Sequence, residues 1–115
     1  MPNGSIINAL IRCTRQDHEA EGLFDLTRPD LGLWVLDLDY ADGDPQAEQI
    51  SEICRQLQAN SVRLQKLREG SDDYTLHLNF DLPERERIVL PPTLCRLASD
   101  CGFNLELYAS RDEEG

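Results

Sequence analysis

The sequence predicts one α+β domain in which two helices cover one face of a single, mostly antiparallel sheet. Apolar and polar residues alternate over several short segments, most clearly from Tyr74 to Asp81, as they do in half-buried strands. Two other stretches carry apolar residues at helical spacing. The chain has 115 residues, 40% of them hydrophobic, which suits one core and is short for two ordinary domains. The expected order is β-β-α-β-β-α-β, with a frayed acidic tail at 110–115.

The first strand is expected from Ser5 to Cys13, where apolar residues recur at every second position. Residues 14–30 show no sustained period and exceed the usual loop length of about four to six residues. Either a short helix lies there or the loop is a functional element. The second strand is expected from Leu33 to Tyr40, and Trp34 shares its face with Leu36, so Trp34 is predicted to lie in the core.

A helix is predicted after Asp44 and Pro45, because aspartate is a good N-cap and proline suits the first turn. Its core stripe consists of Ile50, Ile53, Cys54 and Leu57. The helix is expected to end near Asn60, followed by a third strand from Val62 to Arg68 that forms a hairpin with the strand at 74–81. Continuation of the helix to about Arg68 is the alternative, since Leu64 and Leu67 extend the stripe.

The second helix is predicted to begin at Pro91-Pro92 and to end at Gly102, a natural left-handed C-cap. The last strand is expected over Phe103–Ala109, and residues 82–87 form a charged loop. The sheet face turned away from the helices is then expected to show Arg63, Gln65, Thr75, His77, Asn79, Asn104, Glu106 and Tyr108.

The charge balance excludes several classes of partner. The chain has 22 acidic and 11 basic residues, which gives a formal net charge of -11. Direct binding to nucleic acid needs clustered lysine and arginine, and an anionic membrane would repel this surface. No apolar run approaches the roughly 20 residues that span a bilayer. The basic residues Arg55, Arg63, Lys66 and Arg68 are expected to balance neighbouring carboxylates.

The four cysteines are Cys13, Cys54, Cys95 and Cys101. They form no C-x-x-C pair, and each falls on or near an apolar stripe, so we expect them to be reduced and mostly buried. The N-terminus has no basic segment before its apolar stretch, which is unlike a secretory signal. Both features favour a cytoplasmic location.

From Gly32 to Tyr108 the chain resembles a group of small bacterial proteins that are classed together as a domain of unknown function. The residues that carry the resemblance are Trp34, Leu90, Leu94, Leu97, Ala98, Gly102, Leu105 and Tyr108. In that group a short helix runs into a glycine and a final strand ends near a tyrosine. The resemblance supports the expected fold and leaves the function open, because the group has no established activity. The N-terminal region departs from the group's glycine-rich pattern after the first strand.

No motif in the sequence predicts catalysis. There is no Gly-rich phosphate loop, G-x-S-x-G or H-E-x-x-H, and no cofactor or metal site is expected. Asp37, Asp39, Asp42 and Asp44 lie within eight residues, but their spacing does not match an EF-hand, so a strand end, a turn and a helix cap account for them.

The sequence therefore favours a small acidic interaction module, similar in kind to an immunity protein or an inhibitor, that binds a basic protein. The expected partner-binding residues are Asp37, Asp39 and Asp42. The alternative is a small-molecule-binding or enzymatic domain with a pocket between residues 14–30 and the polar sheet face near His77 and Tyr108. A homodimer formed through an exposed sheet edge is a third possibility.

Overall fold

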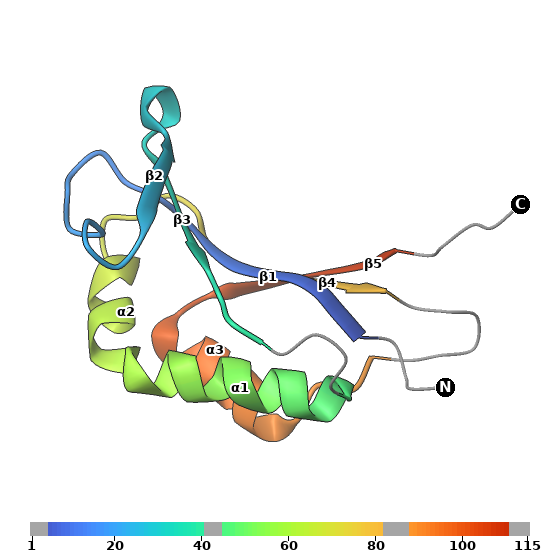
Figure 1. The fold of residues 1–115 in the computed structure, drawn as a ribbon. Helices are drawn as coiled ribbons and strands as arrows, with labels where there is room; N and C mark the ends of the chain where they lie inside the picture. The colour runs from blue at the N-terminus through green and yellow to red at the C-terminus, as the bar shows by residue number, and fades with distance from the viewer. Residues whose placement is uncertain (1–4, 41–44, 82–87, 111–115) are drawn as a thin grey trace, which may run out of the picture.

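The structure is a computed structural model that describes residues 5–40, 45–81 and 88–110. Within these residues three α-helices, not the predicted two, lie on one side of a five-stranded sheet, and the α+β class is confirmed (Figure 1). The strands are β1 (Ser5–Thr14), β2 (Asp25–Arg28), β3 (Leu33–Asp37), β4 (Tyr74–Asp81) and β5 (Asn104–Ser110). The helices are α1 (Gln46–Ala59), α2 (Ser61–Arg68) and α3 (Pro92–Cys101), and a short 3-10 helix, η1, spans Pro29–Leu31.

The sheet is mixed, which corrects the expectation of a mostly antiparallel arrangement. Its order is β2-β3-β1-β4-β5, and β1 runs antiparallel to both β3 and β4. β5 instead runs parallel to β4. The reason is the connection: α3 lies between the two strands in the chain and carries the backbone back to the starting end of β4.

The predicted strand at Val62–Arg68 is wrong, because these residues form α2. Leu64 and Leu67, three residues apart, both face the core, and the Tyr74 hydroxyl donates a hydrogen bond of 2.6 Å to the Leu64 carbonyl. The alternative of continued helix was closer, although α1 and α2 are separated at Asn60. Arg63 and Gln65 therefore lie on a helix and not on the polar sheet face.

Residues 14–30 contain more regular structure than their sequence indicates. β1 continues to Thr14, and β2 pairs with β3 as a short edge strand before η1. The register of this pairing shifts between Leu26 and Arg28, which explains why no clean alternation is visible in the sequence. The predicted cap at Asp44 and the charged loop at 82–87 lie outside the described residues.

The core lies between the sheet and the helices, and its largest fully buried side chains come from β1, β4 and all three helices. Trp34 is 3% exposed and donates from Nε1 to the Arg15 carbonyl at 3.3 Å, so its predicted burial is confirmed. Gly102 has the left-handed conformation expected of a C-cap, with φ of 82°. Cys95 is exposed on α3, which corrects the expectation for that residue, whereas the other three cysteines are buried.

Candidate functional site

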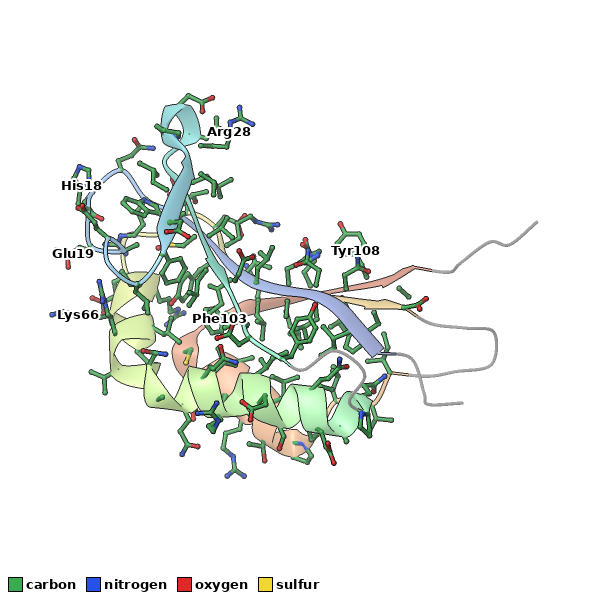
Figure 2. All side chains as sticks on the ribbon, in the orientation of Figure 1. His18, Glu19, Arg28, Lys66, Phe103 and Tyr108 are labelled. Atoms are coloured by element: carbon green, nitrogen blue, oxygen red, sulfur yellow. The ribbon has the colours of Figure 1, made fainter. Side chains whose placement is uncertain are left out.

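No described helix covers the side of the sheet opposite α1, α2 and α3, and we call this side the open face. Alternation along the strands places on it Leu10, Arg12, Asp25, Asp37, Asp73, Thr75, His77, Asp81, Asn104, Glu106 and Tyr108. Figure 2 shows Tyr108 on this side of the sheet, away from the helices, while Phe103 lies between the sheet and the helices. Tyr108 is 53% exposed. Because the strands are paired in register, side chains from β1, β4 and β5 stand next to one another here.

A polar network joins the centre of the open face. Arg12 Nε donates to Asp73 Oδ2 at 2.7 Å, and its Nη1 lies 3.3 Å from Glu106 Oε1. His77 Nδ1 lies 2.9 Å from the same Glu106 oxygen. The ring of Tyr108 packs against that of His77 with 5.0 Å between centroids. One guanidinium thus connects β1 to the start of β4 and to β5.

The carboxylates of this network are held in their charged form. The hydrogen bond from His77 and the contacts with Arg12 lower the pKa of Glu106 below its usual range. Burial on its own would raise the pKa of Asp73, but hydrogen bonds from Thr75 and Arg12 outweigh it and the pKa is lowered. Both groups are therefore ionised at neutral pH.

The open face is strongly acidic. It carries the carboxylates of Asp25, Asp37, Asp73, Asp81 and Glu106. Two guanidinium groups share this side of the sheet, Arg12 on β1 and Arg28 on β2, where Arg28 is the register partner of Leu33. Two of the five, Asp73 and Glu106, pair with Arg12, while no cation among the described residues lies within ion-pair distance of the other three. An acidic surface with an exposed tyrosine on its edge strand is chemically suited to a basic polypeptide.

Two of the three residues predicted for partner binding lie within the described residues. Asp37 lies on the open face, at the end of β3. Asp39 lies beyond the strand, where its backbone exchanges hydrogen bonds of 2.9 and 2.6 Å with the Gln56 side chain. Asp42 lies outside the described residues. The alternative pair is brought together, since His77 and Tyr108 are in contact on neighbouring strands.

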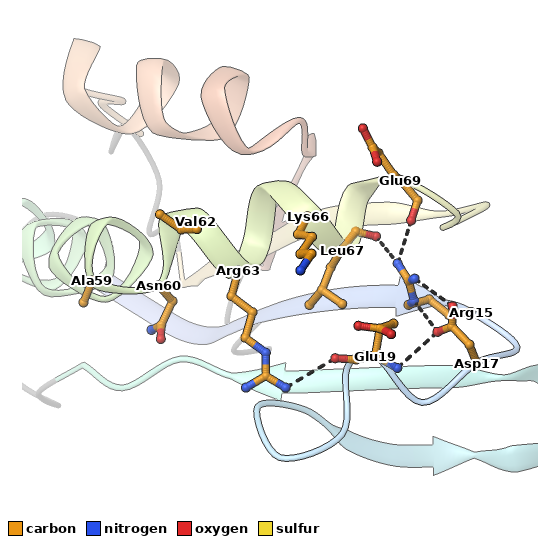
Figure 3. A pocket seen from close by; sticks show the side chains of 10 residues that line it. All are labelled: Arg15, Asp17, Glu19, Ala59, Asn60, Val62, Arg63, Lys66, Leu67 and Glu69. Carbon is orange, nitrogen blue, oxygen red and sulfur yellow. Dashed lines mark hydrogen bonds and ion pairs between the residues drawn. The ribbon is translucent and has the colours of Figure 1, made fainter.

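A hollow of about 760 Å³ lies on the other side of the molecule, between the segment that follows β1 and α2 (Figure 3). It is lined by Arg15, Asp17, Glu19, Ala59, Asn60, Val62, Arg63, Lys66, Leu67 and Glu69. The segment 14–30 therefore does border a pocket. The opposite wall of this hollow is formed by residues of α1 and α2. The polar sheet face was expected from the sequence to form that wall.

Arg15 organises this hollow. Its guanidinium donates to the carbonyls of Leu67 and Glu69 and forms a bidentate pair with Asp17, at 2.7 and 2.8 Å. The hydrogen bond from Arg15 lowers the pKa of Asp17 to about 2. Arg15 is buried, and no sequence pattern predicts this, because an arginine after a strand is usually exposed.

The cations of α2 form no ion pair with a described carboxylate, unlike the expectation from the sequence. Arg63 donates to the carbonyls of Glu19 and Glu21, at 3.3 and 2.6 Å, and so fixes the loop to the helix. Lys66 forms no ion pair with a described residue and extends its ammonium group at the hollow (Figure 3). Arg55 does form the expected kind of pair, with Glu52 at 2.6 Å.

The described residues contain no cluster of three or more histidine, cysteine or acidic side chains that could hold a metal ion. No helix in the described ranges is long and apolar enough to cross a membrane. No protein-family model matches the chain, and neither a curated protein nor a solved structure is significantly similar to it.

Proposed function

We propose that this protein is an interaction module whose open face binds a basic protein. The observation that carries the proposal is the composition of that face: five carboxylates share with two arginines, Arg12 and Arg28, a sheet surface that no described helix covers. Three of these carboxylates, Asp25, Asp37 and Asp81, form no ion pair with a described residue. They are available to lysine and arginine side chains of a partner.

Tyr108 supports the same proposal. Tyrosine is enriched at the energetic centres of protein interfaces, because its ring offers a large contact area at a low cost in conformational entropy. Here the ring rests on His77, which fixes its position beside the acidic residues. A partner would be steered by the net charge of -11 and anchored on this ring.

The proposal is tested with two variants of equal charge change. Asp25→Asn/Asp37→Asn removes two carboxylates from the open face, and Glu48→Gln/Asp100→Asn removes two from the helix layer. Each immobilised protein is exposed to an extract of its source cells, and the retained proteins are quantified by mass spectrometry. A specific basic partner should be retained by the wild type and the helix-layer variant and depleted by the open-face variant.

Kinetics with the purified partner make the test sharper. The open-face variant should associate more slowly and show a weaker dependence of the association rate on salt, since exposed charges act mainly on the on-rate. Equal retention and equal rates for the two double variants would contradict the proposal.

A second candidate function is the binding of a small anionic molecule in the hollow beside α2. It is favoured by the Lys66 ammonium group, which has no ion-pair partner among the described residues, and by the volume of about 760 Å³. A thermal-shift screen of small carboxylates and phosphates tests it. Stabilisation should disappear in Lys66→Gln. It should persist in Arg68→Gln, which removes an equal charge two residues further along α2.

A further inference from the structure

The two edges of the sheet differ in how they are protected. β2, at one edge, has four residues, a register shift between Leu26 and Arg28, and charged residues at both of its ends. Short length, irregular register and charge are the usual means by which proteins prevent an edge strand from pairing with another chain. The β2 edge therefore discourages intermolecular pairing.

β5, at the other edge, is longer and regular, and its one charged residue, Glu106, is paired with Arg12 and His77 of the inner strands. It has seven residues, none of them proline or lysine. Its register with β4 is continuous, from Asn104 opposite Thr75 to Ser110 opposite Asp81. Among the described residues only β4 pairs with it. Leu107, in the middle of the strand, is 40% exposed although it lies on the helix side of the sheet. The outer edge thus offers unpaired backbone groups beside an incompletely covered leucine.

We propose that the outer edge of β5 pairs with β5 of a second copy of this chain, antiparallel and around a two-fold axis at Leu107. In this register Asn104 is opposite Ser110, so all seven residues of the strand are paired. Any other symmetric register pairs fewer residues. The proposal is independent of the function assigned to the open face.

The side chains in this register are self-complementary. Leu107 meets the same leucine of the second copy on the helix side, and Leu105 meets Ala109. On the open face Glu106 meets Tyr108, so two like charges are not placed opposite each other. A two-fold axis at Glu106 would oppose two carboxylates and shorten the pairing.

The expected dimer is weak and strengthened by salt. A seven-residue pairing is roughly 23 Å long, and an interface made mainly by one strand pair falls at the lower end of the size range of specific interfaces, on the order of 1,000 Å². Each chain also carries a net charge of -11, so the copies repel each other until salt screens the charge. Binding of a basic partner should show the opposite dependence, since salt weakens it.

Sedimentation equilibrium of the whole chain tests the proposal. The wild type should pass from the 13.1 kDa monomer to a dimer within about 5–500 µM, and more readily at higher salt. Leu107→Lys should weaken the dimer at least tenfold. Leu26→Lys is the matched control, because Leu26 is 38% exposed on the opposite edge strand, and it should leave the dimer unchanged.

A wild-type protein that stays monomeric throughout this range would overturn the proposal, as would an equal effect of the two lysine variants. Circular dichroism establishes that each variant is folded. If Leu107→Lys does not fold, hydrogen exchange of the wild type decides: the amides of β5 should exchange more slowly at high concentration than at low concentration, whereas those of β2 should not change. No difference at β5 would overturn the proposal.

Discussion

His77 Nδ1 lies 2.9 Å from Glu106 Oε1, and the two residues are directly opposite each other on the parallel strands β4 and β5. The same carboxylate oxygen accepts a hydrogen bond of 3.3 Å from Arg12 Nη1, which comes from β1. A single glutamate on the edge strand therefore gathers partners from the two central strands of the sheet.

Glu106→Gln should make the protein less stable at neutral pH, with a loss that fades in acid. The pKa of Glu106 is lowered in the folded state, so its contacts stabilise the fold above the ordinary value of 4.5 and this contribution is lost as the pH falls through the lowered pKa. Urea unfolding from pH 7 to pH 3 measures it. A difference between variant and wild type that is constant with pH would contradict the prediction.

Arg15→Met should destabilise the protein by about 2–4 kcal/mol, because it leaves buried carbonyl groups without their charged donor. The control is Arg55→Met, which removes a solvent-exposed pair with Glu52 and should cost far less than the loss of Arg15. Chemical denaturation of the two variants gives the comparison, and similar losses would show that Arg15 does not organise the loop.

Trp34→Ala should destabilise by about 3–5 kcal/mol, the usual cost of removing a large buried aromatic side chain. Trp34 is the only tryptophan, so its fluorescence reports on this site alone. In the native protein the emission should be blue-shifted and resist quenching by acrylamide. Red-shifted, readily quenched emission would place the ring in solvent.

One thiol should react quickly with a thiol reagent and three slowly. Cys95 is exposed, whereas burial raises the pKa of Cys13, Cys54 and Cys101 and so reduces their thiolate fraction. Cys95→Ser should abolish the fast phase. Fast reaction of two or more thiols in the native protein would be inconsistent with this arrangement.

Replacing Asp37, Asp39 and Asp42 together by asparagine should change the free energy of unfolding by less than about 0.5 kcal/mol. The side chains of Asp37 and Asp39 are exposed and form no ion pair with a described residue. Thermal unfolding checks this, and slower association with a basic partner should accompany the unchanged stability. A large loss of stability would assign these residues a structural role.

The strands with clean alternation were predictable from the sequence, and those with irregular register were not. β4 alternates without interruption and was identified residue by residue, whereas the bulged pairing hides β2. α2 was ambiguous because two leucines three residues apart also fit a strand with one irregular position. Pairing direction was missed because it depends on where α3 delivers the chain, which local pattern does not encode.

Part of the site could likewise be predicted. His77 and Tyr108 were expected on one sheet face, and their contact follows from the register of β4 and β5. Arg15 and Gln49 could not be identified, because single polar residues on a polar background give no sign of burial. Gln49 is 1% exposed, and its Oε1 accepts a hydrogen bond of 2.8 Å from the Ile6 amide, which joins α1 to β1.

The position of β5 also has a consequence for synthesis of the chain on the ribosome. β4 is rich in buried apolar side chains, and its partner on one side, β1, has long been available when β4 emerges. Its other side must wait until α3 and then β5 have been translated. During that interval the nascent protein exposes an apolar strand, β4, with one edge unpaired. Slow translation after residue 81 should therefore favour misassembly or chaperone binding.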